Sequence, residues 1–498
     1  MPTVTRSVVA LATACALLFG LGGCIRTPDP LPSTSPTTSD DPNRPFTVLT
    51  AQRATTTDPA GLRNDTDAMV ALDLYQRLLM YQPSTGTLRP DLAKECLYTA
   101  ETVYECTLPK ELIFTSGHAL TSSDVKFSLQ RALRLANGRL SLLSALDTIE
   151  TPDPWTVRFR LKYPDNQFGV GLAVPGASIV DEEAYDADQI RPMTQAAVGS
   201  GPYSLEGLNN QGITLAKYAG YTGPLGTDMP RLRIQWSDSA DAEQALIDQK
   251  AEIVWRTLSP AAIDRVEGRI KEALDAQRPL PFWRLPLNRT VLQRLVWLPN
   301  SPQRTNATLR RAVALALQED RTATSILPSI IEGHTDSFAI GGDPALPAIG
   351  KDTVLTLSYT NTAPGMDDLA RHVRDRLTER LGIEVRLVTE GEAADLDLRD
   401  SSPQANTSLG WLQDYLNAPL PGSADKLDDL EERIRSSSRP EVQLPALSEL
   451  QKQAAVDATV VPIAEVDGVL YLRGRADLVG EALGPGWQLA LWGARWRT

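Results

Sequence analysis

The chain is poor in the residue types on which metal and nucleophile chemistry depends. Its three histidines, His118, His334 and His372, are far apart in the sequence and show none of the spacings typical of a zinc site. A Walker phosphate loop and a dinucleotide-binding glycine motif are also missing. Gly199-Ser200-Gly201 is typical of a turn rather than of a nucleophile elbow, which needs G-x-S-x-G. These absences argue against an enzyme, and we predict neither a bound metal nor a cofactor.

An excess of positive charge is lacking as well. The chain has 49 Lys and Arg residues against 62 Asp and Glu residues, which gives a net charge of −13. Nucleic acids and anionic lipids are bound by basic surfaces, so we predict neither as a direct partner. After the first 24 residues, no run is long and apolar enough to span a bilayer.

The N-terminal segment predicts export and a lipid anchor. Arg6 precedes the apolar run Val8–Leu21, which is too short to span a bilayer and is followed by small residues. Leu21-Gly22-Gly23-Cys24 resembles a bacterial lipobox, in which cleavage precedes the cysteine and its thiol is lipidated. We expect residues 1–23 to be a signal peptide. Cys24 would then anchor the chain to the outer face of the bacterial cytoplasmic membrane. The alternative is a plain signal peptide in which Cys24 is incidental.

A linker and a large folded body follow. Residues 24–45 are rich in proline, serine, threonine and aspartate, which predicts an extended tether without a core. Fully stretched, at about 3 Å per residue, it would reach roughly 60 Å. The remaining chain is too long for one hydrophobic core, so two or three lobes are expected.

Two cysteines lie in the body of the chain. Cys96 and Cys106 flank a stretch that predicts two short strands with a turn near Ala100-Glu101. Cysteines at the two feet of a hairpin can reach bonding distance, and an exported protein favours their oxidation. We therefore predict a disulfide. A metal site, which would need more ligands, and a reactive thiol pair are the alternatives.

Apolar periodicity predicts an alternating α/β chain. A strand at Phe46–Thr50 opens the fold, helices follow at Asp67–Met80 and Thr121–Asn137, and Thr121 is expected to cap the second of them. Farther on, a strand at Val354–Tyr359, a helix at Asp367–Leu381 and a strand at Ile383–Val388 predict a β-α-β unit with parallel strands. The stretch Val469–Trp496 carries strand-like segments that are expected to pair back onto the first lobe.

Several segments together resemble the large, family 5 substrate-binding proteins of ABC importers, which include dipeptide-, oligopeptide- and nickel-binding members. They occur in family order, from about residue 46 to the C-terminus, and each alone is a weak signal. The similar segments are Asp73–Leu78 with Gly86–Ala93, Thr121–Leu129, Gly199–Tyr203, Arg310–Leu317 and Gly410–Tyr415, the last of which resembles the family's "GW..DY" strand end.

The resemblance implies an α/β, two-lobed fold of the periplasmic-binding-protein type (class II, cluster C). It has an additional subdomain in the first lobe and a ligand cleft between the lobes, which a hinge closes. The expected divisions are lobe I at residues 46–280 with its subdomain at about 81–195, lobe II at 281–468, and a return to lobe I at 469–498.

The resemblance also implies a site. In peptide-binding members, the aspartate of the "W..DY" motif holds the α-amine of the ligand, and this residue is Asp414 here. The chemistry is sound, because a buried ammonium group needs a carboxylate partner. Trp411 and Tyr415 are then either cleft walls or core residues. The exit of the first strand maps loosely onto further ligand contacts at Ala54, Thr55 and Thr56.

The chain departs from the family after Tyr415. Leu416-Asn417-Ala418-Pro419 follows, and the segment before the predicted acidic helix Asp425–Arg435 is shortened. That piece normally helps to close the cleft, so the size of a ligand and its retention stay open.

Three functional hypotheses follow. The leading one is a monomeric, lipid-anchored protein that captures a short peptide and delivers it to the permease subunits of an ABC transporter. The second keeps this role with a non-peptide solute, such as a metal chelate or a sugar. The third is a ligand-free envelope scaffold or regulatory lipoprotein.

Overall fold

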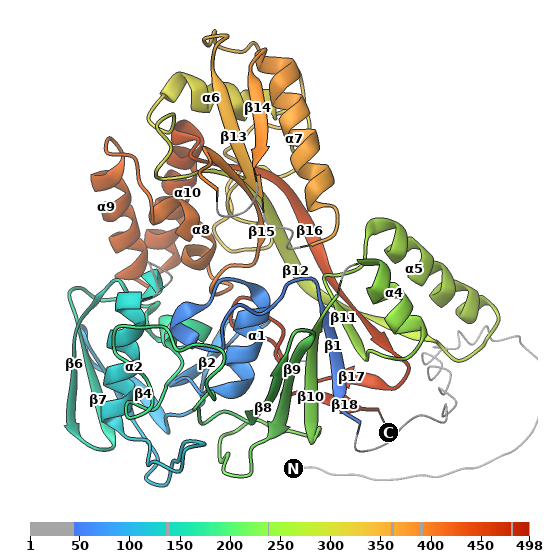
Figure 1. Ribbon diagram of the computed structural model, residues 1–498. Helices are drawn as coiled ribbons and strands as arrows, with labels where there is room; N and C mark the ends of the chain where they lie inside the picture. The colour runs from blue at the N-terminus through green and yellow to red at the C-terminus, as the bar shows by residue number, and fades with distance from the viewer. Residues whose placement is uncertain are drawn as a thin grey trace, which may run out of the picture.

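A computed structural model describes residues 44–135, 140–237, 239–359, 363–388, 392–479 and 482–497 (Figure 1). The predicted signal peptide, Cys24 and nearly all of the linker lie outside these ranges. So does the predicted end of the second helix near Asn137. The described part is a mixed α/β structure in which two lobes share one large sheet.

The large sheet has ten strands and runs through both lobes. In spatial order they are β14 (Glu384–Val388), β13 (Val354–Tyr359), β15 (Leu396–Ser401), β12 (Phe282–Trp297), β16 (Val460–Arg473), β11 (Ile253–Trp255), β1 (Phe46–Thr50), β10 (Arg231–Trp236), β9 (Gly212–Lys217) and β8 (Tyr203–Asn209). We call the part with β1 and β8–β11 lobe I, and the part with β13–β15 lobe II.

Two long antiparallel strands, β12 and β16, belong to both lobes (Figure 1). The two strands pair with each other along their length. In lobe I, β16 also pairs with β11, and in lobe II, β12 also pairs with β15. The β12–β16 register is interrupted between Pro286 and Thr290, opposite Gly468. A second shift lies between Gln293 and Arg294, and we take the longer interruption at Pro286–Thr290 as the candidate hinge of the sheet. The domain divisions at residues 280 and 468 stay predictions.

Lobe I carries an additional layer around a small antiparallel sheet. Its strands lie in the order β4 (Glu95–Ala100), β5 (Val103–Thr107), β7 (Thr156–Leu161) and β6 (Leu146–Asp153). The short elements around them are β2 (Leu79–Gln82), β3 (Thr87–Pro90), α2 (Ser122–Leu135), η2 (Ser141–Leu143), α3 (Phe168–Gly171) and η3 (Pro175–Ala177). Cys96 and Cys106 face each other in the β4–β5 ladder and form a disulfide with Cα atoms 4.1 Å apart. The predicted hairpin and its disulfide are therefore confirmed.

The remaining elements cover the large sheet. In lobe I they are η1 (Pro59–Gly61), α1 (Asp65–Leu74), α4 (Ser239–Ile247), α5 (Pro260–Asp275), β17 (Ala476–Leu478) and β18 (Ala494–Trp496). In lobe II they are α6 (Ala307–Ala316), α7 (Met366–Leu381), α8 (Ser408–Leu416), α9 (Ala424–Arg435) and α10 (Pro440–Asp457). Among the helices of the described ranges, none has the length and apolar character needed to cross a membrane.

The β-α-β prediction is confirmed. Strands β13 and β14 pair in parallel, and α7 connects them. Gly382 ends α7 in the left-handed region at φ 66°, a conformation that glycine adopts without a steric penalty. The expected strands at Phe46–Thr50 and Val354–Tyr359 coincide with β1 and β13. The end of β16 pairs with β11 of lobe I at Tyr471 and Leu472, and the return of residues 469–498 to lobe I stays a prediction.

The predicted helix Asp67–Met80 is wrong in its second half. The structure begins α1 at Asp65 and ends it at Leu74, and Leu79 and Met80 lie in β2. Arg77, which is fully buried, donates to the carbonyl oxygens of Leu72 (3.3 Å) and Tyr75 (2.9 Å) and so satisfies the helix end. The apolar stripe continues past the helix because the segment that follows is also buried, which periodicity alone cannot distinguish from a longer helix.

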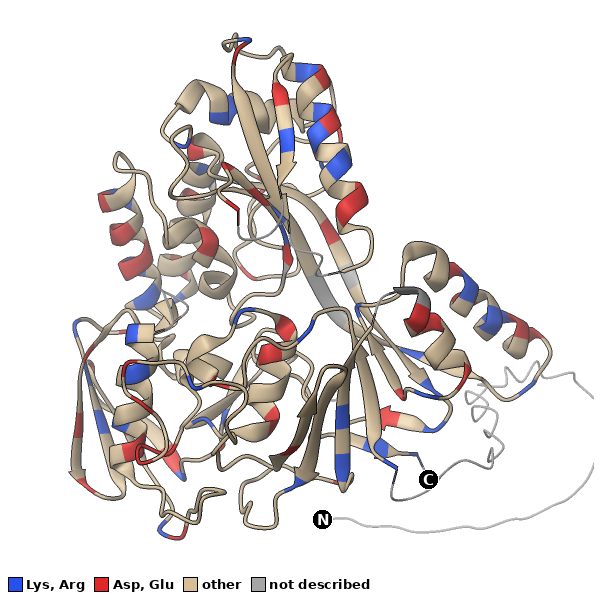
Figure 2. Ribbon diagram, viewed as in Figure 1, with Lys and Arg blue, Asp and Glu red and all other residues tan. Residues whose placement is uncertain are grey.

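Charged residues gather on the outer helices. Figure 2 shows acidic residues along α9 and residues of alternating charge along α5 and α7. In α9, Asp428, Asp429 and Glu432 are exposed, while Leu427, Leu430 and Ile434 are buried. These acidic side chains therefore form a solvated helix face.

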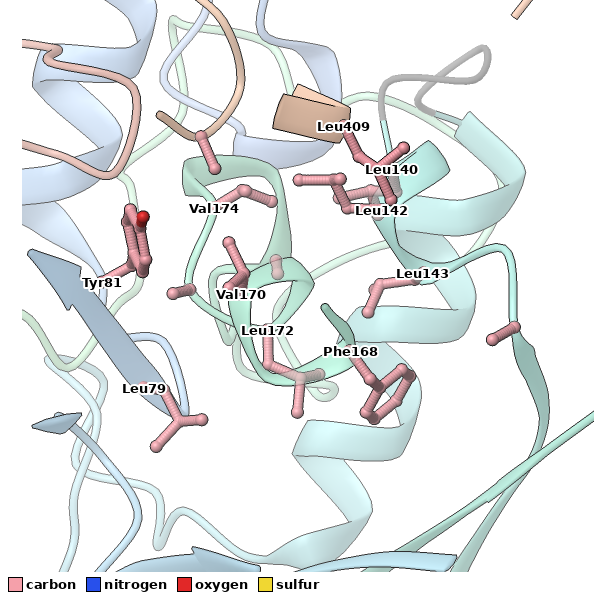
Figure 3. Close-up of a cluster of buried hydrophobic side chains, with 14 of the residues drawn as sticks. Leu79, Tyr81, Leu140, Leu142, Leu143, Phe168, Val170, Leu172, Val174 and Leu409 are labelled. Carbon is pink, nitrogen blue, oxygen red and sulfur yellow. The ribbon is translucent and has the colours of Figure 1, made fainter. Parts of the chain in front are cut away.

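One hydrophobic cluster joins the additional layer of lobe I to lobe II. It includes residues of η2 and α3 together with residues of α8, α9 and α10. Figure 3 shows Leu409 of α8 directed toward Leu140 and Leu142, with Phe168 and Val170 deeper in the same cluster. Because the interface between the lobes is continuous with a core, separating them would expose apolar surface.

A buried ion pair crosses the same interface. Arg435 at the end of α9 pairs with Asp165 of lobe I at 3.0 Å, and both side chains are fully buried. The guanidinium also donates to Leu142 O (3.4 Å) and Ser141 O (3.3 Å) and pairs with Glu431 of its own helix (2.7 Å). Asn166 adds a side-chain bond to Ser437 O at 2.6 Å. Such a pair is costly to break, because the remaining partner keeps an uncompensated buried charge.

We predict that Asp165→Asn destabilises the protein by about 3 kcal/mol, because the buried Arg435 then loses its fully buried counter-charge and keeps only the partly exposed Glu431. The measurement is the free energy of unfolding in denaturant. The matched control is Asp275→Asn, which breaks an exposed pair with Lys271 (2.5 Å) and should leave the unfolding midpoint unchanged. Equal midpoints for both variants would contradict a structural role for the pair.

A second prediction concerns Asp73 on α1, whose carboxylate accepts the N–H of Leu491 with both oxygens at 3.1 Å. Burial raises the pKa of Asp73 from 3.8 to about 8, against the opposing effects of that hydrogen bond and of Arg77. Because the pKa of Asp73 is higher in the folded than in the unfolded state, protonated Asp73 favours the folded state. This contribution to stability is fully present below pH 3.8 and is lost as the pH rises toward 8.

Wild type should therefore lose stability relative to Asp73→Asn between about pH 4 and pH 8. Unfolding midpoints measured at several pH values in this window test the expectation. Asp368→Asn, at an exposed position of α7, is the control and should run parallel to wild type. A parallel curve for Asp73→Asn would show that Asp73 is ionised in the folded state.

Candidate functional site

The short segment of lobe II that connects β15 to α8 packs against lobe I. We call residues Ser402–Thr407 the seam segment. The N–H of Asn406 donates to Pro485 O at 2.7 Å, and the Tyr81 hydroxyl donates to Asn406 O at 3.1 Å. Main-chain atoms of lobe II are thus bound by lobe I as the backbone of an extended ligand is bound.

The C-terminal part of lobe I is shaped for this contact. Gln488 Nε2 donates to Pro403 O at 3.2 Å. At Gly486, an added Cβ would lie 1.8 Å from Pro403 O, so the close approach of the two chains requires glycine there. The seam segment and residues 484–488 therefore form a complementary pair across the lobe boundary.

Arg256 makes the ionic contact across the same boundary. It follows β11 of lobe I and bonds the carboxylate of Asp400, at the end of β15 of lobe II. Asp65 of α1 lies 3.4 Å from the guanidinium on the lobe I side. Burial of Arg256 disfavours its charge, but Asp400 and Asp65 outweigh this effect and raise its pKa. The group is therefore a permanent cation at the meeting point of the lobes.

Asp414 lies on α8 in a cluster of charges. Its carboxylate accepts bonds from Arg294 of β12 and, at 2.6 Å, from Arg399 of β15. Burial opposes ionisation of Asp414, but Arg294 and Arg399 outweigh it and hold its pKa below the usual value. The carboxylate is ionised at neutral pH, and 22% of the side chain is exposed. It keeps free lone pairs, although two cations already orient it.

The expected "GW..DY" strand end is wrong in its secondary structure. Gly410–Tyr415 lies within helix α8, and the strand of this region is β15, which ends at Ser401. Trp411 is 3% exposed and its Nε1 donates to Asn406 Oδ1 at 3.0 Å. Tyr415 is 1% exposed and its hydroxyl donates to Asp457 at 2.6 Å. Of the two alternatives for these aromatic side chains, the structure places both in the core.

The loop after β1 is held by one carboxylate. Asp67 accepts the N–H of Thr55 at 2.6 Å, its hydroxyl at 2.8 Å, and the N–H of Thr56 at 3.2 Å. Ala54 and Thr56 are buried, whereas Thr55 is exposed. Asp65 lies on the same helical turn as Asp67, so the loop stands beside the helix end that faces Arg256. Ionic contacts therefore run from α1 through Arg256 to Asp400 across the lobe boundary, whereas the partners of Asp414, Arg294 and Arg399, both belong to lobe II.

Sequence reasoning missed the arginines and most of the carboxylates of this junction. Asp397, Arg399 and Asp400 are three charges within one six-residue strand, and Arg294 lies in an otherwise apolar stretch of β12. These residues could have been found as charged residues within strands that are otherwise expected to be buried, because buried charges need partners of opposite charge. Among the described residues, no three His, Cys, Asp or Glu side chains are arranged to hold a metal ion.

Comparison with known proteins agrees with this architecture. A family model described as bacterial extracellular solute-binding proteins, family 5, matches residues 87–345. The chain is 31% identical over 160 residues to the probable D,D-dipeptide-binding periplasmic protein DdpA of Escherichia coli K12, an alignment that covers 30% of this chain and 31% of DdpA. It is 23% identical over 526 residues to the probable ABC transporter periplasmic-binding protein SapA of the same strain, covering 91% and 92%. The alignments with the first curated relatives span only about a third of their length.

Solved structures share the fold over nearly all of the chain. A dipeptide-binding protein from Pseudoalteromonas sp. SM9913, in complex with Met-Leu, superposes with a TM-score of 0.75 at 15% identity, covering 91% of this chain and all of that one. The periplasmic binding protein AgaA of A. tumefaciens R10, in complex with agropinic acid, gives 0.73 at 18% identity, covering 91% and 99%. The two-lobed fold is therefore confirmed.

The match to the family model over half of the chain, and the shared two-lobed fold, place it among solute-binding proteins rather than enzymes. This chain belongs to family 5 of the bacterial extracellular solute-binding proteins.

Proposed function

We propose that this protein is a lipid-anchored, monomeric binding protein that captures a short peptide between its lobes and delivers it to the permease subunits of an ABC transporter. The observation that carries the proposal is the seam, where lobe I already binds the main chain of residues 403–406 through Tyr81, Pro485 and Gln488. A surface that satisfies one extended backbone offers the same donors and acceptors to another.

The charges at the lobe boundary support a zwitterionic solute. Asp414 supplies an ionised carboxylate for an ammonium group, and the loop Ala54–Thr56, in which Thr55 is exposed while Asp67 accepts the N–H groups of Thr55 and Thr56, is the proposed contact on the lobe I side. The relatives whose names include dipeptide binding and ABC transport agree with this chemistry. The assignment of Asp414, Trp411 and Tyr415 as ligand contacts stays part of the proposal. The core positions of Trp411 and Tyr415 favour a supporting role for those two aromatic side chains.

One observation favours a second function. The seam segment fills part of the boundary, and the fully buried Arg435–Asp165 pair resists opening of the lobes. A protein with permanently closed lobes would act in the envelope by protein contacts, as a scaffold or regulatory lipoprotein. A non-peptide solute is the remaining alternative. A measurement of ligand binding distinguishes peptide capture, binding of another solute and a ligand-free scaffold.

We predict that a pool of di- to pentapeptides raises the melting temperature of the full chain in detergent. At about 100 times its dissociation constant, a ligand of the folded state adds about 2.7 kcal/mol. Asp414→Asn should abolish the shift if its charge holds the α-amine. The matched control is Asp397→Asn, since Asp397 pairs with the same Arg399 at 2.8 Å but lies on β15. No shift in wild type, with native mass spectrometry showing an empty protein, would contradict peptide capture.

The anchor is tested separately. In a bacterial host, wild type should fractionate with the membrane, and Cys24→Ser should appear in the soluble extracytoplasmic fraction because its thiol can no longer be lipidated. Cys24 lies outside the described residues, so circular dichroism of both proteins is compared to check the folded body. Mass spectrometry of the N-terminal peptide identifies the lipid. If Cys24 carries no lipid, the predicted anchor is wrong, and the N-terminal segment is a plain signal peptide.

A further inference from the structure

We propose that Arg256 binds the carboxylate of the captured solute, and that Asp400 holds the place of this carboxylate while the lobes contact each other directly. The inference rests on the proposed function and deepens it, because it specifies the chemistry of the same site. The solute class that it names is one with a free carboxylate, such as a peptide with an unblocked C-terminus.

The backbone of Arg256 is unusual. Its φ of 53° lies in the left-handed region, which a residue with a Cβ rarely adopts. Such conformations persist where the surrounding structure holds them, and they occur most often at active sites and ligand clamps. Here the conformation turns the chain immediately after β11, beside the other lobe. The side chain is 12% exposed, so the position presents a nearly buried guanidinium to the boundary.

The two partners of Arg256 are unequal. On its own lobe, Asp65 lies 3.4 Å away, which is a long contact. The close partner is Asp400 of lobe II, which contributes both its carboxylate and, at 3.3 Å, its carbonyl oxygen. A guanidinium matches a carboxylate in a planar, two-point geometry. In this structure Nη2 of Arg256 alone bonds one carboxylate oxygen and the carbonyl oxygen of Asp400, so Arg256 already binds a carboxylate of the other lobe through a single nitrogen.

Asp400 keeps a partner of its own when the lobes part. Its second oxygen accepts a bond from Gln293 Nε2 of β12 at 3.2 Å, within lobe II. Rotation about the β12–β16 irregularity would carry Asp400 and Gln293 away together and leave Arg256 facing the open boundary. A largely buried cation without a close counter-charge is costly, and an incoming carboxylate removes this cost.

The residue that follows Arg256, Thr257, has a buried hydroxyl without a hydrogen-bond partner among the described residues. Thr257 is 1% exposed. A buried hydroxyl in that condition needs an explanation, because most such groups are paired. A solute carboxylate bound by Arg256 has a second oxygen that can accept the Thr257 hydroxyl.

The experiment compares two probes on the full chain by calorimetry: a pool of di- to pentapeptides with free C-termini, and the same pool amidated. Wild type should bind the free pool about tenfold or more tightly than the amidated pool, as for loss of a charge-assisted hydrogen bond. Arg256→Gln should remove this preference. Asp400→Asn should tighten binding of the free pool severalfold, because the internal competitor is gone. Arg265→Gln, at an exposed pair with Glu243, is the control and should match wild type.

Each contrary result has a distinct meaning. Equal binding of both pools by wild type overturns the role of Arg256 and leaves peptide capture intact. Weaker binding of both pools by Asp400→Asn overturns the competitor role, because the pair would then serve only to stabilise closure. Binding of neither pool overturns the proposed function and this inference with it. Circular dichroism spectra of each variant, compared with wild type, exclude misfolding as the cause of a lost preference.

Discussion

The pairing of β12 with β16 through both lobes is the constraint on which the other contacts between the lobes depend. Because both strands extend through both lobes, separating the lobes completely would break main-chain hydrogen bonds, and the interruption of the register at Pro286–Thr290 is the candidate hinge. A rotation about one short irregularity returns the same surfaces to each other at every closure. The seam segment, α9 and Arg256 can therefore meet defined partners, since the hinge specifies where they arrive.

The contacts formed by closure are of two kinds. Around Arg435 and Asp165, both charges are fully buried and surrounded by the cluster that Figure 3 shows, so this side resembles the interior of a domain. Around Arg256 and Asp400, the ion pair is less completely buried and stands beside the exposed Thr55. The contacts around Arg435 and Asp165 stabilise the contact between the lobes without a solute. Under the proposed function, the second kind consists of charges and main-chain groups that a solute replaces, so that closure around a solute depends on its chemistry.

This division bears on affinity. A protein whose closed form is stabilised by its own contacts must exchange some of them for contacts with a solute, so the observed affinity is a difference between two sets of similar interactions. The shortened segment after Tyr415 fits this view. It leaves α8 close to α9 and α10, and the junction is closed by Leu409 and its neighbours rather than by a longer loop. Selectivity then depends on the few exchangeable groups at the seam.

The sequence by itself determined the local elements and the order in which they occur. The β-α-β unit, the Cys96–Cys106 hairpin and the cap of α2, where Thr121 N–H donates to Asp124 at 2.9 Å, follow from periodicity and short-range hydrogen bonding. The family followed from ordered motifs. Only the tertiary structure decided that Gly410–Tyr415 is helical, that Trp411 is core, and that Arg256 meets Asp400. The Arg256–Asp400 contact joins residues 144 positions apart, and the energy of such a contact depends on burial and partners that no local pattern contains.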